Sequence, residues 1–258
     1  MPSVLWEKDG PVGLMTFNRP EALNSFDDDL LSGALACLEA AGADPELRVL
    51  ILTGAGRAFC AGGDVAHLQK LPDEAAVSQF IKRTGELAAR LHRFPRPVIA
   101  RVNGVAAGAG ANLALACDLI VAGTSARFGQ SFARVGLIPD AGGHCFLPRA
   151  VGLAKAKELM FTGALLGAEE ARSLGLVNRV APDGQLAEST LALAREIAAG
   201  PPLALARIKE NLNLSFGLTL EQMLARETEG QVAALMSRDG REGLRAFGER
   251  RPPLFTGE

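Results

Sequence analysis

Two glycine-rich runs constrain this chain most, because each follows a strongly apolar segment of the kind that forms a strand. Residues 59–64 read Phe-Cys-Ala-Gly-Gly-Asp, and residues 103–110 begin with Asn-Gly and end with Gly-Ala-Gly. Backbone without side chains can approach a ligand closely and present its N–H groups at the strand end. Two convergent N–H groups in a dry site stabilise negative charge on a carbonyl oxygen. The runs therefore predict an oxyanion hole.

Strand and helix patterns alternate around these runs. Short β-branched-rich segments at 48–53 and 97–102 read as buried strands, and a helical pattern at 73–92 separates them. The alternation predicts the α/β class with parallel strands. The remaining expected elements of this part are a hairpin (4–8 and 12–17), helices (26–42, 112–116 and 155–161) and a strand (118–122).

The C-terminal part reads almost entirely as helix from residue 185 onward. The clearest helical segments are 191–199, 203–214 and 220–236, and the pair Pro201-Pro202 breaks the pattern. We therefore divide the chain into a core, residues 1–200, and a helical region, residues 201–258. An all-helical tail of this kind is expected to pack on a neighbouring copy of the chain.

Composition and charge exclude several function classes. A formal net charge of −2 with 22% charged residues leaves no electrostatic footprint for nucleic acid. No apolar run approaches the roughly 18 residues of a membrane span, and the first residues carry no signal pattern, so we expect a cytoplasmic protein without a membrane partner. The four cysteines lie far apart without a CxxC pair, which predicts neither a metal site nor disulfides.

Ordered motifs along almost the whole chain carry a resemblance to a known family. They are residues 17–24 (Phe-Asn-Arg-Pro-Glu-Ala-Leu-Asn), 52–64, 96–104, 107–110, 117–118 and 136–143 (Gly-Leu-Ile-Pro-Asp-Ala-Gly-Gly). With them the chain resembles the crotonase superfamily, also called the enoyl-CoA hydratase/isomerase family. The last motif also looks like that of the ring-epoxide isomerase of aerobic phenylacetate breakdown.

The resemblance implies a fold and a partner. The fold is a crotonase-like spiral of ββα turns with two roughly perpendicular sheets, in which residues 1–200 bind acyl-CoA and the helices of 201–258 form trimers or dimers of trimers. Periodicity alone leaves a doubly wound sheet open. The implied substrate is an acyl-CoA thioester, so coenzyme A belongs to the substrate and no separate cofactor is expected.

The resemblance also assigns binding positions. The two oxyanion N–H groups fall at Gly63 and Ala109, and the latter would gain from a helix N-terminus. Arg250 is placed to meet a phosphate, or is an ordinary surface cation. The coenzyme A moiety would lie along five further positions: Ala22, Leu23, Ala61, Asp64 and Val65.

The chain departs from the hydratases at their two catalytic glutamates, which fall by motif at Asn112 and Phe132. Adding water to a double bond needs one group that activates the water and another that delivers a proton. Neither replacement is a carboxylate, so ordinary hydration is disfavoured. Asn112 could bind substrate or a water, or it could close a polar network left by the absent glutamate. Phe132 is expected to line the substrate pocket.

Asp140 falls where several isomerases of the family carry an aspartate. One carboxylate suffices to remove a proton at C2 of an acyl-CoA and to return it at C4. We expect Phe128, Phe132 and three aliphatic neighbours to desolvate Asp140 and raise its pKa; the three are Val135, Leu137 and Ile138. An aspartate after proline can equally be a turn or cap residue.

Three functions follow from this pattern. The leading hypothesis is an acyl-CoA isomerase that shifts a double bond through an enolate held by Gly63 and Ala109, with Asp140 as the base. The second is a hydratase with water oriented by Asn112 and a proton from Asp140 or His144. The third is a non-catalytic acyl-CoA-binding trimer. His144 could orient a catalytic group or simply begin a helix.

Overall fold

A computed structural model describes all residues, 1–258, and its strands form two sheets. The six-stranded sheet has the order β1 (Val4–Asp9), β2 (Val12–Phe17), β3 (Val49–Gly54), β5 (Val98–Val102), β7 (Leu119–Gly123), β10 (Arg179–Ala181). The four-stranded sheet has the order β4 (Ala58–Cys60), β6 (Val105–Ala107), β8 (Arg127–Gly129), β9 (Leu165–Gly167). Only the end pairs β1–β2 and β8–β9 are antiparallel.

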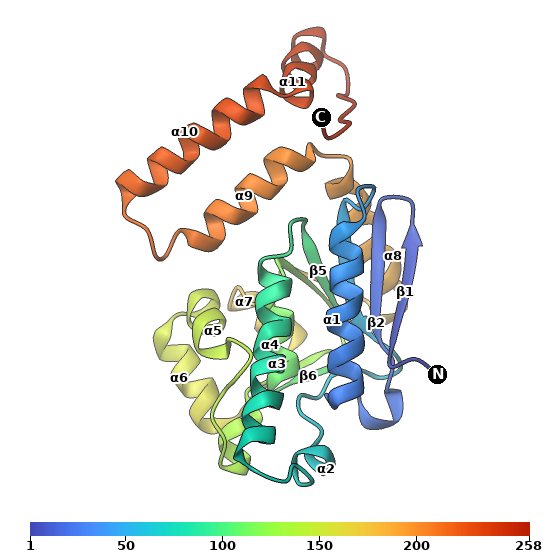
Figure 1. The fold of residues 1–258 in the computed structure, drawn as a ribbon, viewed down its shortest axis with the longest axis vertical. Coiled ribbons are helices and arrows are strands. Elements are labelled where there is room, and N and C mark those ends of the chain that lie inside the picture. The colour runs from blue at the N-terminus through green and yellow to red at the C-terminus, as the bar shows by residue number, and fades with distance from the viewer.

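Three consecutive strand pairs build both sheets together. In each of the pairs β3–β4, β5–β6 and β7–β8, the first strand joins the large sheet and the second joins the small one. A helix then returns the chain to the next pair, so the backbone advances as a spiral of ββα turns (Figure 1). The structure thus has the spiral topology rather than a single doubly wound sheet. The carboxyl ends of β4, β6 and β8 meet at one edge.

The central strands of the large sheet are buried on both faces, which explains their apolar runs. All six residues of β3 are buried. Leu50 and Leu52 belong to the main core, which also takes in α1 (Asp28–Ala43), α3 (Glu74–His92) and α4 (Ala109–Ala116). Val49 and Ile51 point to the opposite face and pack with α8 (Leu186–Ala198).

The two long helices of the core begin where the sequence predicts. Asp27 precedes α1 and accepts a hydrogen bond from the Leu30 N–H at 2.9 Å, and Asp73 caps α3 in the same way through the Ala76 N–H at 2.8 Å. Such caps stabilise a helix by about 1 kcal/mol. By contrast, α4 begins at Ala109, three residues before the predicted start. Gly108, at φ +53°, lets the chain enter the helix almost directly from β6.

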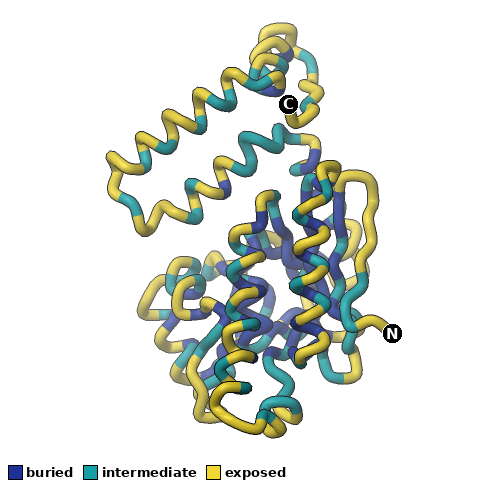
Figure 2. The backbone as a smooth tube through the Cα atoms, viewed as in Figure 1, coloured by how far each residue is buried: buried dark blue, intermediate teal, exposed yellow.

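The remaining helices cover the ends of the spiral or leave it. They are α2 (Val65–Leu68), α5 (Gly143–Val151), α6 (Leu153–Thr162), α7 (Ala168–Ser173), α9 (Pro202–Leu214), α10 (Leu220–Met236), α11 (Arg238–Glu249), and the 3₁₀ turns η1 (Pro20–Ala22), η2 (Ser131–Val135) and η3 (Asp183–Gln185). No helix combines the length and apolar character that a bilayer span requires. Helices α9 to α11 project from the body, and α10 buries none of its residues (Figures 1 and 2).

A buried ion pair attaches α9 to the body. Lys209, only 8% exposed, places its Nζ 2.7 Å from Oδ2 of Asp118 and 3.1 Å from the carbonyl oxygen of Arg96. The same carboxylate oxygen accepts a hydrogen bond from the Val98 N–H at 2.7 Å. Burial raises the pKa of Asp118, although Lys209 opposes this shift. The pair therefore links α9 to the starts of two central strands, β5 and β7.

We expect Lys209→Met to lower the free energy of unfolding by about 3 kcal/mol, because it leaves the Asp118 carboxylate inside the protein without its cation. The measurement is the urea unfolding midpoint at matched chain concentration. Lys70→Met is the control, since Lys70 is exposed and makes no ion pair or side-chain hydrogen bond. Equal midpoints for the two variants would contradict a stabilising role for the pair.

Candidate active site

The two glycine-rich runs meet at the edge formed by the ends of β4 and β6. These strands are parallel neighbours, and Gly63 and Ala109 follow their last residues. A Cβ placed on Gly62 would lie 2.9 Å from the carbonyl oxygen of Ala107 and 3.3 Å from the backbone nitrogen of Ala109. Gly62 has φ +95°. The close approach of the two runs thus depends on a position without a side chain.

The N–H groups of Gly63 and Ala109 donate no hydrogen bond within the protein. Their neighbours are bonded: the Gly62 N–H contacts Cys60 Sγ at 3.4 Å, and the Asp64 N–H donates to the Phe26 carbonyl oxygen at 2.9 Å. Ala109 is the first residue of α4, where backbone N–H groups lack helical partners and the helix dipole favours an anion. The pair is free to donate to a developing oxyanion.

The predicted coenzyme A groove is assembled from two adjacent segments. The Ala61 N–H donates to the Leu23 carbonyl oxygen at 3.0 Å, and the Phe26 N–H donates to that of Gly62 at 2.7 Å. Leu23, at φ +53°, turns the chain after η1 and is partly exposed together with its neighbour Ala22. Val65 opens α2 with 63% of its surface exposed. The structure therefore brings Ala22, Leu23, Ala61, Asp64 and Val65 to one region.

The carboxylate of Asp64 already has protein partners. It caps α2 by accepting from the N–H groups of Ala66 and His67 at 3.0 and 3.2 Å, and it pairs with Arg19 at 3.1 Å. Although burial acts in the opposite direction, the Arg19 guanidinium and these N–H groups hold the pKa of Asp64 below its ordinary value. Arg19 also pairs with Asp27 at 3.0 Å. Asp64 thus connects the start of α2 to Arg19.

Arg250 does not join this groove within one chain. It is exposed and ends α11 in a left-handed conformation with φ +57°. Figure 1 shows α11 at the opposite end of the molecule from α2. The predicted phosphate contact therefore has no counterpart inside a single copy.

Asp140 is attached to the helix that begins at Ala109. Asn112 lies one turn further along α4, and its Nδ2 donates to the backbone carbonyl oxygen of Asp140 at 2.9 Å. Oδ1 of Asp140 is buried and has no hydrogen-bond partner. Burial raises the pKa of this carboxyl from 3.8 to about 6. The residue that caps α5 is Gly142, so Asp140 is not a helix cap.

The source of this desolvation differs from the prediction. Val135, Leu137 and Ile138 were expected to cover Asp140, but 68%, 53% and 78% of their surfaces are exposed. Ala141, the residue after Asp140, is buried in the main core. The pKa shift has the predicted direction, but the three aliphatic side chains predicted to cause it are largely exposed.

Phe132 and His144, two further candidates from the sequence, have different surroundings. Phe132 is half-buried, and its ring lies 3.6 Å from a Cβ placed on Gly108, so it packs against the start of α4. His144 is the second residue of α5 and is exposed. Gly142, two residues before His144, lines a cleft of about 900 Å³ between α3, α5 and α9.

Asn112 closes a polar network, and this network includes two residues that sequence reasoning missed. Its Oδ1 accepts from Nε2 of buried Gln130 at 2.7 Å, so both ends of its amide are occupied. A Cβ on Gly143 would lie only 2.4 Å from Asn112 Nδ2. Gly143 belongs to the motif at residues 136–143, but its contact with Asn112 joins positions 31 residues apart in the sequence. Nothing in the sequence around Gln130 indicates its bond to Asn112.

Comparison with known proteins agrees with this architecture. The profile described as Enoyl-CoA hydratase/isomerase matches residues 7–258. The chain belongs to this family.

Relatives within the enoyl-CoA hydratase/isomerase family carry more than one activity in their names. The 1,2-epoxyphenylacetyl-CoA isomerase of Escherichia coli (strain K12) is 43% identical over 247 residues, which cover 95% of this chain and 94% of that protein. A probable enoyl-CoA hydratase of Rhodobacter capsulatus is 40% identical, with 99% of this chain and 98% of that protein covered. Enzymes of this family act on acyl-CoA thioesters. The names of the relatives do not decide whether this chain is an isomerase or a hydratase.

The fold is that of the same family. The crystal structure of an enoyl-CoA hydratase from Bacillus anthracis matches with a TM-score of 0.95 at 34% identity, over 99% of this chain and all of that one. An enoyl-CoA hydratase from Polaromonas sp. JS666 matches equally well, with a TM-score of 0.95 at 37% identity, over 98% of this chain and 99% of that one. The crotonase-type spiral predicted from the motifs is therefore confirmed.

Proposed function

We propose that this protein is an acyl-CoA isomerase that moves a carbon–carbon double bond through a thioester enolate. The observation that carries the proposal is a pair of unpartnered N–H groups, Gly63 and Ala109, with a single desolvated carboxyl, Asp140, tied to the same helix. Such a set can stabilise an enolate oxygen and move one proton. It lacks the second carboxylate that hydration uses in this family.

The reaction needs one base that acts twice. In a 3-enoyl-CoA, the Asp140 carboxylate removes a proton from C2, and the electron pair moves onto the thioester oxygen between Gly63 and Ala109. The enolate then collapses with the double bond between C2 and C3, and Asp140 returns the proton to C4. A pKa near 6 suits both steps, because the carboxyl is ionised at neutral pH and its acid form is still accessible.

Direct assay distinguishes this function from its alternatives. The purified protein is given a 3-enoyl-CoA, and formation of the conjugated 2-enoyl product is followed by its absorbance, with deuterium uptake at C2 measured in D₂O. Isomerisation with exchange supports the proposal. Tight thioester binding without either signal would favour a non-catalytic acyl-CoA-binding protein.

Hydration is the second candidate, because the Rhodobacter capsulatus relative is named a probable enoyl-CoA hydratase. Its proposed water would be oriented by Asn112, whose amide is already bonded at both ends, and its proton donor would be Asp140 or exposed His144. These contacts weigh against it. Loss of the conjugated absorbance of crotonyl-CoA at a rate above buffer would restore it.

The activity is expected to show an acidic limb with a midpoint of about pH 6, because protonated Asp140 cannot accept the C2 proton. As pH rises through the pKa, kcat/KM increases and then levels off. The measurement is kcat/KM for the 3-enoyl-CoA between pH 4.5 and about 8, at constant ionic strength. A limb near pH 4 would indicate an unperturbed carboxyl and contradict the desolvated position.

We further propose that residues 201–258 mediate a homotrimer or a dimer of trimers. Many apolar side chains of α9 to α11 have no cover in one chain, and a surface of this kind marks an interface. They are Ile208, Leu212, Leu214, Leu220, Leu224, Val232, Leu235, Met236, Leu244 and Phe247. Sedimentation equilibrium tests the assembly: three or six chain masses support it, and one chain mass contradicts it.

A further inference from the structure

Gln130 lies at the end of β8, in the same row of strand ends as the two oxyanion segments. Its backbone follows Gly129, whose carbonyl oxygen accepts a hydrogen bond from the Gly108 N–H at 2.9 Å. The side chain is 4% exposed. Nε2 donates to Asn112 Oδ1 at 2.7 Å, and Oε1 has no partner. The Asn112 contact is therefore the one hydrogen bond that the Gln130 side chain makes.

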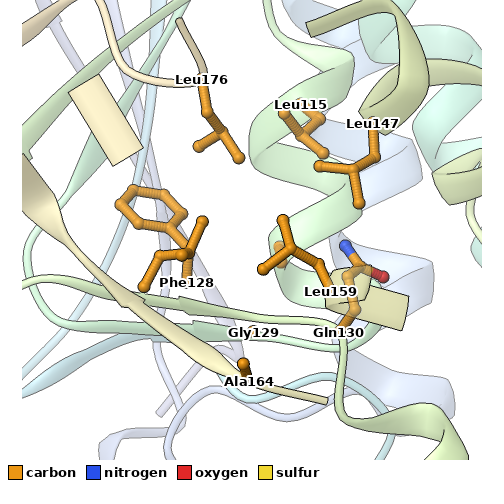
Figure 3. A pocket seen from close by; sticks show the side chains of 10 residues that line it. Leu115, Phe128, Gly129, Gln130, Leu147, Leu159, Ala164 and Leu176 are labelled. Atoms are coloured by element: carbon orange, nitrogen blue, oxygen red, sulfur yellow. The ribbon is translucent and has the colours of Figure 1, made fainter. Parts of the chain in front are cut away.

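One side of Gln130 is apolar. It borders a narrow apolar cavity in which leucine side chains and Phe128 converge, with the Gln130 amide at the edge (Figure 3). The cavity measures about 10 Å³, which leaves room for at most one water. Burying an amide oxygen without a hydrogen-bond partner costs free energy, so the presence of this side chain calls for an explanation.

The bond from Gln130 holds the acceptor end of the Asn112 amide, whose donor end faces Asp140. A carboxamide has a donor end and an acceptor end on one plane. Nε2 of Gln130 donates to Oδ1 at 2.7 Å, while the Asn112 Nδ2 donates to the Asp140 carbonyl oxygen at 2.9 Å, so the two bonds together hold the Asn112 amide in one orientation. If the Asn112 amide turned over, its oxygen would face that carbonyl oxygen and repel it.

We propose that Gln130 is a positioning residue for Asp140 and acts through the orientation of the Asn112 amide. The inference rests on the proposed function, because it assigns Asp140 the role of base. The backbone after Asp140 adopts an unusual conformation, with Ala141 at φ +45° and Gly142 at φ +80°. A left-handed alanine is strained and persists where surrounding contacts hold it. The Asn112 bond provides one such contact.

The test is Gln130→Met, which keeps the length of the side chain and suits the apolar cavity but removes the donor. We expect kcat for isomerisation to fall about 10- to 100-fold, the loss typical of a misplaced catalytic group. KM should stay within about twofold, because the groove segments around Leu23 and Ala61 are untouched. The acidic limb should move below pH 6 as the released carboxyl gains solvent. Gln79→Met, the same change at an exposed site on α3, is the control.

A double-variant comparison separates positioning from general stability. Asn112→Leu alone and Asn112→Leu with Gln130→Met should have equal kcat, because Gln130 acts only through Asn112.

Gly143→Ala places a methyl group against Asn112 from the other side. It should reproduce the kcat loss and the shifted acidic limb even if Gln130→Met fails to fold. Unchanged kcat and limb in Gln130→Met, or independent losses in the double variant, would overturn the proposal. If Asp140→Asn is also fully active, the proposed function itself fails.

Discussion

Asp140→Asn is expected to lower kcat/KM for double-bond isomerisation by about 10²- to 10⁴-fold, the usual contribution of a general base. Asparagine has nearly the same shape and can keep the backbone bond to Asn112, but it cannot accept the C2 proton. Deuterium exchange at C2 should fall together with turnover, because both need the same proton transfer. The measurement pairs the absorbance assay with mass spectrometry of substrate recovered from D₂O.

Stability provides the control for this variant. The folded pKa of about 6 lies above the ordinary value of 3.8, so the ionised carboxyl destabilises the folded state, and this cost grows as pH rises from 3.8 to about 6. Asn carries no charge to bury. At pH 8 the variant should therefore unfold at a higher urea concentration, by an amount that corresponds to about 3 kcal/mol at most. A well-folded variant with the parental rate would show that another group is the base.

Ala109→Pro should lower kcat by about 10²- to 10³-fold, because it removes one oxyanion donor. Ala109 is the first residue of α4, the helical position that tolerates proline best. The preceding Gly108 has ψ −129°, outside the helical region that a following proline disfavours. The ring also occupies the space in front of the former N–H. Rate constants and KM for the 3-enoyl-CoA measure the effect.

Ala109→Gly is the matched control, since it changes the side chain and keeps the N–H. It should retain activity within about tenfold, because the proposed chemistry uses only the backbone. Circular dichroism checks that the proline variant keeps its helices. A folded Ala109→Pro protein with the rate of Ala109→Gly would exclude the Ala109 N–H from the oxyanion hole.

The sequence predicts those parts of the fold that depend on local patterns. Strands β3 and β5 are mostly apolar because both of their faces are largely buried, and Asp27 and Asp73 mark helix starts through their own side chains. The strands β4, β6, β8 and β9 have three residues each, too few to show an alternating pattern. The spiral was accessible only through the resemblance to a family.

In the candidate site, too, local patterns predict some features and not others. Gly63 and Ala109 lie within three residues of strand ends, so backbone donors at these positions can be inferred from glycine and chain order. The exposure of Leu137 depends on what lies over its loop, and no local pattern encodes that. The role of Gln130 depends on a hydrogen bond to a residue 18 positions away. Such contacts arise only when three separate strand ends are brought together.

Helix α4 carries Ala109 at its first position and Asn112 one turn later, so the oxyanion donor and the tether of the proposed base are parts of one rigid body. Motion of the projecting C-terminal helices, or remodelling of the loop at 135–138, therefore leaves the spacing between these two elements intact. In evolutionary terms, these peripheral segments can change in sequence without altering how the donor and the tether are spaced.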